Sequence, residues 1–188
     1  RGSFLALYGK PGSGKSTLLN TVPLFREGVE VVPIEPRESI PDVLDGFKPF
    51  PGRLRIVIIK AREALANTAK EEIEAALLAI NNFLRSAEGS NTLVAWPCSL
   101  PALRDCLVEA ALGIGGPSLL GTGAAVNYEG PPKEQFLPIA RSTIATFNAG
   151  ATLIDWGITE AWARKLAEQA DTIGTFLQRL GQEARSRL

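Results

Sequence analysis

The sequence predicts an α/β protein in which a parallel sheet of about five strands has helices on both faces and is followed by a small helical region. Three observations lead to this fold class. A glycine-rich segment, residues 9–17, lies between a short apolar run and the start of a helical pattern. Residues 54–59 and 92–96 are short, largely apolar runs, which is typical of strands covered on both faces. Helical patterns separate these runs, and alternating strands and helices form parallel sheets.

The glycine-rich segment carries the most specific signal in the chain. It has the spacing G-x-x-x-x-G-K-[ST] of a phosphate-binding P-loop, and the strand before it and the helix after it are the context that this motif requires. The glycines allow successive backbone N–H groups to face one anion, and the helix N-terminus adds its positive dipole end. We therefore expect the nucleotide to be bound by Gly9, Lys10, Pro11, Gly12, Ser13, Gly14, Lys15, Ser16 and Thr17.

Two side chains of the motif have separate expected roles. Lys15 should reach the β- and γ-phosphates, which also makes it a catalytic candidate, and the Ser16 hydroxyl should bind Mg²⁺. A guanine-reading Asn-Lys-x-Asp motif does not occur in the sequence. The expected ligands are therefore ATP, in preference to GTP, and Mg²⁺.

The other elements follow from periodicity and from glycine and proline positions. Pro33 places the second strand at an edge of the sheet or marks its end, and Pro97 should close the fourth strand. A Thr-x-x-Glu capping box at Thr68 should open the helix that follows the third strand. The predicted strands are residues 4–8, 29–34, 54–59, 92–96 and 124–128. The predicted core helices are residues 42–47, 68–86 and 100–112, and residues 113–123 are predicted to be a loop because they are rich in glycine.

The chain after residue 130 is predicted to be helical. Residues 134–147 form one candidate helix, and residues 159–170 form a second with Thr159 as its N-cap. A third helix, capped by Asp171, has apolar residues at helical spacing. We therefore expect two domains, a nucleotide-binding core over residues 1–130 and a helical subdomain over residues 131–188.

Composition narrows the class of protein. The 20 basic and 20 acidic residues cancel, so the overall charge does not predict binding to nucleic acid or a membrane. With 45% hydrophobic residues and no apolar run of the ~20 residues needed to span a bilayer, the sequence predicts a soluble cytoplasmic domain. The absence of histidine and of a Cys-x-x-Cys pair argues against zinc. The absence of methionine leads us to expect a part of a longer polypeptide with additional domains.

The order of these parts resembles the AAA+ ATPases, in which a P-loop core is followed by a helical lid that closes over the nucleotide. Residues 128–144 resemble the junction to the first lid helix, because a proline-containing segment leads into a helical pattern. Residues 158–184 resemble the last two lid helices. The resemblance implies an ATP-binding core with a lid at residues 131–188.

Several positions depart from the family pattern. The resemblance places a Mg²⁺-linked Asp and a water-activating Glu after the third strand, where this chain has Lys60 and Ala61. Glu63, three residues beyond Lys60, is the remaining catalytic candidate, although it is more simply a loop charge paired with Lys60 or Arg62. The fourth strand should end in a polar residue that orients water, for which Ser99 or Cys98 is available.

The arginine finger that the resemblance places before the fifth strand has no counterpart in residues 119–130. Arg104 and Arg141 remain candidates for a γ-phosphate contact, although solvated helix-face charges are the simpler interpretation. The three tryptophans, Trp96, Trp156 and Trp162, are expected in hydrophobic cores.

These observations predict a Mg-ATP-binding module that works as a nucleotide-dependent switch or regulatory domain, with weak or no hydrolysis, and that is a monomer when isolated. An active ATPase is an alternative. A small-molecule kinase is another and would need Glu35, Glu38 or Glu63 to accept a proton. A signalling NTPase or a module with a purely structural nucleotide also remains open.

Overall fold

The computed structural model describes residues 2–62, 70–121 and 124–187. It divides into two compact units. The first comprises Arg1–Gly9 and Lys15–Tyr128, and the second comprises Lys10–Gly14 and Glu129–Leu188. The tip of the P-loop motif therefore belongs to the same unit as the C-terminal helices, whereas both ends of the motif belong to the sheet-containing unit.

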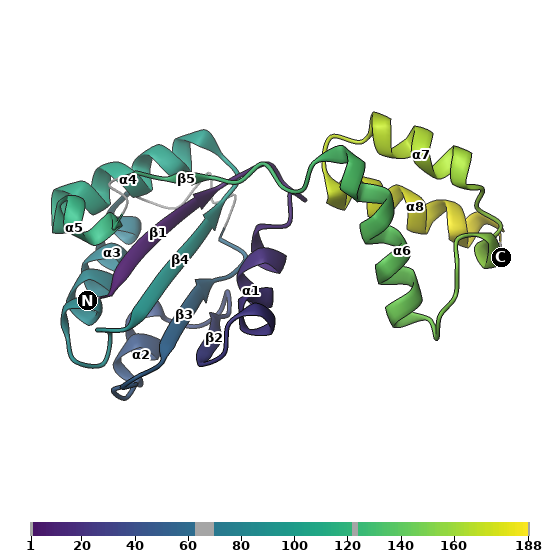
Figure 1. Cartoon of the computed structure of the whole chain (residues 1–188). Coiled ribbons are helices and arrows are strands. Elements are labelled where there is room, and N and C mark those ends of the chain that lie inside the picture. Colours follow the sequence, from purple (N-terminus) through teal and green to yellow (C-terminus); the bar gives the residue numbers. More distant parts are fainter. Residues whose placement is uncertain (1, 63–69, 122–123, 188) are drawn as a thin grey trace. The chain divides into compact units, whose positions relative to one another are not determined.

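The first unit is built on a five-stranded sheet in which every paired strand is parallel, as the sequence predicts (Figure 1). The strand order is β2-β3-β4-β1-β5, so β4 lies between β1 and β3. Because β2 is an edge strand, Pro33 lies where a missing N–H is tolerated. The strands are β1 (Ser3–Tyr8), β2 (Val29–Ile34), β3 (Leu54–Ile59), β4 (Thr92–Cys98) and β5 (Val126–Asn127).

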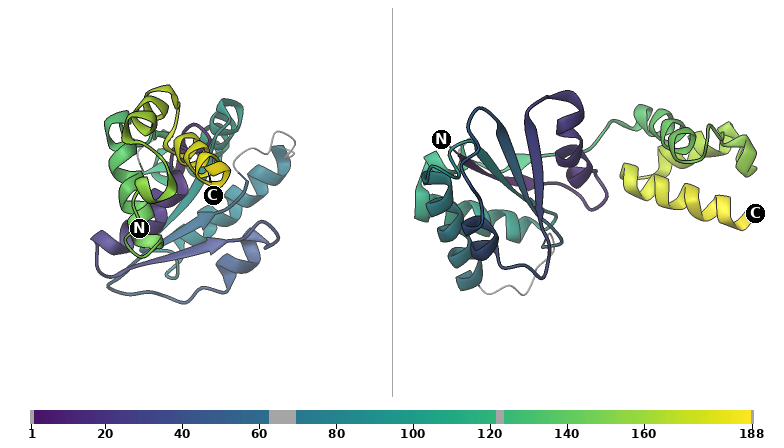
Figure 2. Two further views of the ribbon diagram at one scale, coloured as in Figure 1. Left: turned by 90° about the vertical axis from the view of Figure 1, so that its right-hand side faces the viewer. Right: turned by 90° about the horizontal axis from the view of Figure 1, so that it is seen from below.

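Helices cover both faces of this sheet, as predicted. Along β3, Ile56 and Ile58 face one side and Val57 and Ile59 face the other, as the period of two requires. The first side packs against Leu19 of α1, and the second side packs against the remaining helices (Figure 2). The described helices of this unit are α1 (Lys15–Phe25), α2 (Ile40–Asp45), α3 (Lys70–Arg85), α4 (Pro101–Gly115) and α5 (Pro117–Leu120).

In this unit the structure differs from the sequence prediction at the end of β4 and after residue 112. β4 continues through Pro97 to Cys98, because the β3–β4 pairs end at Ala95 and only β1 pairs with the strand at Pro97. The predicted glycine-rich loop contains the end of α4 and all of α5, whose first residue is Pro117. Proline is favourable at the first helical position. The predicted capping residue Thr68 lies outside the described residues.

The second unit has its own hydrophobic core. Phe136 and Phe176 stack with ring centroids 5.8 Å apart, and both are buried. Thr159 caps α7, as predicted, by accepting a hydrogen bond from the Trp162 N–H. The cap of α8 is Thr172 and not Asp171, because the Thr172 hydroxyl accepts from the Thr175 N–H. The elements are η1 (Lys133–Gln135), α6 (Phe136–Phe147), η2 (Ile154–Trp156), α7 (Glu160–Gln169) and α8 (Ile173–Arg187).

The three tryptophans pack in or against the hydrophobic cores, as expected. Trp96 is buried in the first unit, and Trp156 and Trp162 are partly buried against the core of the second. Within the described ranges, no helix has the length and apolar character needed to cross a bilayer.

The separate core of the second unit makes a testable prediction. Replacing Phe176 by Ala should destabilise this unit by about 3–5 kcal/mol, because the change removes a fully buried ring and leaves a cavity. Hydrogen exchange should then show faster exchange in α6, α7 and α8 and unchanged exchange in β3 and β4. Phe147→Ala is the matched control, since this α6 ring is 80% exposed. Equal acceleration in both units after Phe176→Ala would contradict a separate core.

Candidate nucleotide-binding site

The P-loop motif forms a connection between a strand and a helix. β1 ends at Tyr8 and α1 begins at Lys15, so the strand–loop–helix context expected from the sequence is present. Residues 10–13 form a turn in which the Ser13 N–H donates to the Lys10 carbonyl over 3.1 Å. Pro11 and Gly12, with φ of +75° at Gly12, are the central residues that a type II turn favours.

Lys15 is the buried cation of the motif. Its side chain is only 3% exposed, and its ammonium donates to the Gly9 carbonyl over 2.8 Å and to the Ser99 hydroxyl over 3.0 Å. The ammonium lies at the N-terminus of α1, where the helix dipole also contributes positive charge. Two sources of positive charge at one buried position make this end of the sheet favourable for an anion.

Strand order explains why Ser99 reaches Lys15. β1 pairs with β4 so that Tyr8 is level with Cys98, and the next residue of each strand, Gly9 and Ser99, leaves the sheet at the same edge. The Gly9 N–H donates to the Cys98 carbonyl over 3.1 Å, which extends this pairing by one step. Of the two candidates for the polar residue at the tip of β4, Ser99 contacts the motif lysine. Cys98 is fully buried in the hydrophobic core.

The position expected to hold a metal-binding carboxylate is occupied by a paired lysine. Lys60 follows the last residue of β3, and its ammonium lies 2.8 Å from the Glu35 carboxylate, which follows the last residue of β2. The Lys60 N–H also donates to the Ile34 carbonyl over 3.0 Å. Ala61 has φ of +52°, an uncommon conformation for a residue with a side chain. Glu63, the other acidic candidate, lies outside the described residues.

This donor set is a poor match for a protein-held Mg²⁺. Mg²⁺ prefers oxygen ligands, usually one or two carboxylates with phosphates and water. Of the expected ligands, Ser16 supplies one hydroxyl, and Lys60 supplies a cation in place of a carboxylate. The Glu35 carboxylate is held by Lys60. The described part of the chain contains no group of three or more His, Cys, Asp or Glu residues arranged to bind a metal.

The tip of the loop contacts the start of α8 within the second unit. The Gly174 N–H donates to the Gly12 carbonyl over 2.8 Å. A Cβ on Gly174 would lie 2.7 Å from the Gly12 Cα, and a Cβ on Gly130 would lie 2.6 Å from the Ser13 carbonyl oxygen. Two glycines far away in the sequence therefore allow close approach of other backbone segments to the loop.

Ser13 is an unusual buried polar residue. Its side chain is completely buried, and among the described residues its hydroxyl has no hydrogen-bond partner. An unsatisfied buried polar group costs about 1–3 kcal/mol, so such groups need a structural or functional explanation. Ser13 lies inside the motif that the sequence predicts to bind phosphate, and a bound anion or water would satisfy its hydroxyl.

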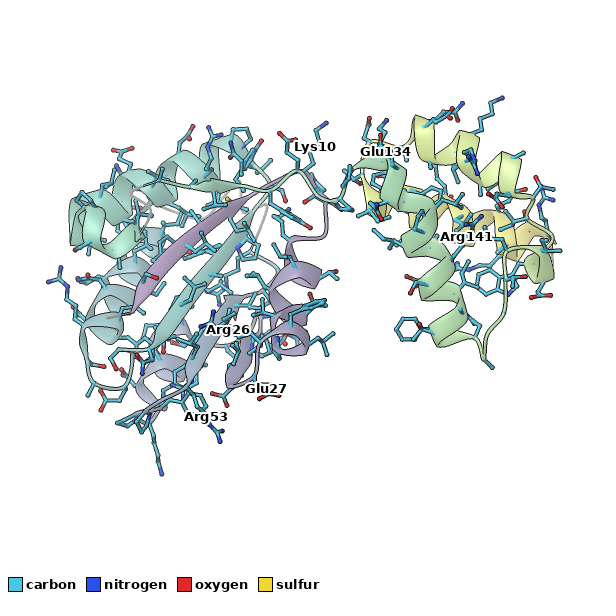
Figure 3. All side chains as sticks on the ribbon, viewed as in Figure 1. Lys10, Arg26, Glu27, Arg53, Glu134 and Arg141 are labelled. Atoms are coloured by element: carbon cyan, nitrogen blue, oxygen red, sulfur yellow. The ribbon has the colours of Figure 1, made fainter. Side chains whose placement is uncertain are left out.

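The two arginine candidates have partners on the protein. Arg104 donates to Asp105 over 2.7 Å and lies 4.8 Å from the centroid of the Tyr8 ring, and the hydrogen bond to Asp105 raises the pKa of Arg104. Arg141, on α6, lies 2.6 Å from the Glu160 carboxylate (Figure 3). Hydrogen bonds lower the pKa of Glu160, and the bond from Arg164 has a larger effect than the bond from Arg141. Both arginines therefore take part in ion pairs with carboxylates of the chain.

Sequence reasoning missed three features of this region. Glu35 was considered only as a proton acceptor, although its level position across from Lys60 on paired strands was predictable once strand order was known. The contacts of Gly130 and Gly174 with the loop join residues more than a hundred positions apart. The one available signal for Gly174 was a glycine in the first turn of a predicted helix, where glycine is otherwise unfavourable.

Comparison with known proteins does not assign the chain to a family: no protein-family model matches it, and no significant match is found among curated proteins.

The contact between α8 and the loop predicts a difference between two glycines of one helix. Gly174→Ala should force α8 away from Gly12, because the new methyl group would lie 2.7 Å from the Gly12 Cα. We expect a loss of about 1–3 kcal/mol in the unfolding free energy and faster exchange at the start of α8. Gly181→Ala is the control, since a Cβ there meets nothing within 4 Å, and it should stabilise α8 by about 0.5–1 kcal/mol. Urea denaturation and hydrogen exchange measure both effects, and similar behaviour of the two variants would rule out the contact.

Proposed function

We propose that this chain is a nucleoside triphosphate-binding module that binds ATP at residues 9–17. The observation that carries the proposal is the Lys15 ammonium, buried at the N-terminus of α1 and at the carboxyl edge of a parallel sheet. Ligands of open α/β sheets bind at this edge, and phosphates bind at helix N-termini. The unsatisfied Ser13 hydroxyl gives independent support, because a phosphate oxygen is a suitable partner for it.

We further propose that the module is AAA+-like. The parallel sheet and the helical second unit agree with the order of parts in that family. The Ser99 hydroxyl at the tip of β4 contacts the P-loop lysine, which suits the polar residue that the resemblance places at the end of the fourth strand. In this interpretation the helices after residue 130 are the lid.

Hydrolysis is proposed to be slow or absent. Phosphoryl transfer depends on positioning, on charge neutralisation and on a group that orients the attacking water. Lys60 and Ala61 remove the carboxylates that the family uses after the third strand. We propose that Mg²⁺ is present only as the ion bound to ATP, with Ser16 as its expected protein ligand.

A module that binds ATP without rapid turnover can act as a switch. The loop tip belongs to the same unit as α8, and the Gly12 carbonyl accepts a hydrogen bond from Gly174. A phosphate that reorients residues 12–14 would therefore change the contact that α8 makes. ATP can act as a switch only if it stabilises one arrangement of the loop and α8 more than another. We propose such a regulatory role within a larger protein, with the isolated chain as a monomer because residues 119–130 lack an arginine finger.

A small-molecule kinase is the second candidate function. It needs a carboxylate that is available to accept a hydroxyl proton. The Glu35 carboxylate is paired with Lys60, and the Glu38 carboxylate accepts a hydrogen bond from the Glu35 N–H over 2.7 Å. Because both carboxylates already have partners, the nucleotide-dependent switch is favoured over the small-molecule kinase.

The binding proposal is tested with Lys15→Ala. The change removes the hydrogen bonds that the Lys15 ammonium is expected to donate to the β- and γ-phosphates, each of about 1.5–3 kcal/mol, and should weaken ATP binding by about 100-fold or more. Isothermal titration calorimetry measures the affinity, and Lys165→Ala, an exposed lysine of α7, is the matched control. Unchanged affinity in Lys15→Ala would refute binding at the motif.

The hydrolysis proposal is tested with a phosphate-release assay, with and without small-molecule hydroxyl acceptors. We expect turnover on the order of 10⁻³ s⁻¹ or slower, as in P-loop NTPases without a complete catalytic set. Turnover above roughly 1 s⁻¹ would identify an active ATPase. Turnover that requires an acceptor would identify a kinase.

A further inference from the structure

We propose that ATP binding at this site does not depend on Mg²⁺, because Lys60 supplies positive charge at the strand end where a metal-binding carboxylate is expected. This inference rests on the proposed nucleotide-binding function. It concerns which positive charge neutralises the phosphates of bound ATP. The inference can therefore be wrong even if ATP binds at this site.

Strand pairing places Lys60 at the edge of the sheet that carries the motif lysine. Ile58 of β3 is level with Ala95 of β4, so Lys60 is level with Pro97, and Pro97 is paired with Leu7 of β1. Adjacent strands are about 4.8 Å apart, so the Lys60 backbone lies roughly 10 Å from β1. Lys60 is therefore a second lysine at the carboxyl edge where β1 leads into the motif.

The ion pair with Glu35 orients the Lys60 ammonium and leaves it able to change partners. The two groups are 2.8 Å apart, and their side chains are 36% and 51% exposed. Solvent-exposed ion pairs contribute little net stability, so exchange of a carboxylate for a phosphate oxygen has a small energetic cost. A triphosphate carries more negative charge than one carboxylate and is the stronger partner for Lys60.

The same lysine makes the site unfavourable for a protein-held divalent cation. Like charges repel each other at short range, and Lys60 replaces the negative group that would attract Mg²⁺. Ser16 is the one expected Mg²⁺ ligand that remains in the described part of the motif and strand ends. A neutral hydroxyl alone is a weak protein contribution to Mg²⁺ binding. Nucleotide binding should therefore depend on Lys15, Lys60 and the loop amides.

The test compares ATP binding in excess Mg²⁺ and in excess EDTA by isothermal titration calorimetry. For the unaltered chain we expect the two dissociation constants to agree within about threefold. Lys60→Asp should restore metal dependence, with binding in EDTA at least about 10-fold weaker than in Mg²⁺. Lys48→Asp, which makes the same charge change at an exposed position of the first unit, should leave the two constants similar.

A second variant tests the role of the ion pair without introducing a carboxylate. Glu35→Gln releases Lys60 from its partner and should tighten ATP binding in EDTA by a few fold. Metal-dependent binding by the unaltered chain, with at least about 10-fold loss in EDTA, would overturn the inference and leave the proposed function intact. Absence of ATP binding in both solutions would overturn the two together.

Discussion

The strand order and the candidate site are both tied to the position of the Lys15 ammonium. Burial of an ammonium is unfavourable unless oxygen atoms surround it, and the Gly9 carbonyl and the Ser99 hydroxyl supply two of them. Ser99 is available only because β4 lies beside β1. A sheet with β3 beside β1 would bring Lys60 next to the motif and place two ammonium groups together. Strand order and site chemistry are therefore linked.

The sequence predicted the parallel sheet well because its signals are local. Residues 29–34 and 54–59 were assigned as strands with the bounds that the structure has, since short apolar runs flanked by glycine and proline have few alternatives. The caps were harder, because Asp171 and Thr172 are both good capping residues and only the geometry distinguishes them. Pro97 was misjudged because the cost of a proline in a strand depends on which neighbouring strands extend beside it.

For the candidate site, the sequence predicted the glycine-rich motif but not the residues that pack around it. The spacing of Gly9, Gly14 and Lys15 predicts a phosphate-binding loop without any tertiary information. The Lys60–Glu35 pair, the approach of Gly174 to Gly12 and the unsatisfied Ser13 hydroxyl depend on the packing of distant segments. The first two also set this loop apart from the pattern that the family resemblance implies. The contact with Gly174 joins the loop to a helix, and Lys60 stands where the resemblance places an acidic residue.

The most direct measurement of the central claim is an NMR titration of the ¹⁵N-labelled chain with ATP. We expect the largest amide shift changes at Gly12 to Thr17, because backbone N–H groups of the loop and of the first turn of α1 are proposed to hold the phosphates. Smaller changes should follow at Ser99 and at Gly174, which contact Lys15 and Gly12. Shift changes confined to other surfaces, or no changes at saturating ATP, would contradict the claim that this loop binds a nucleotide.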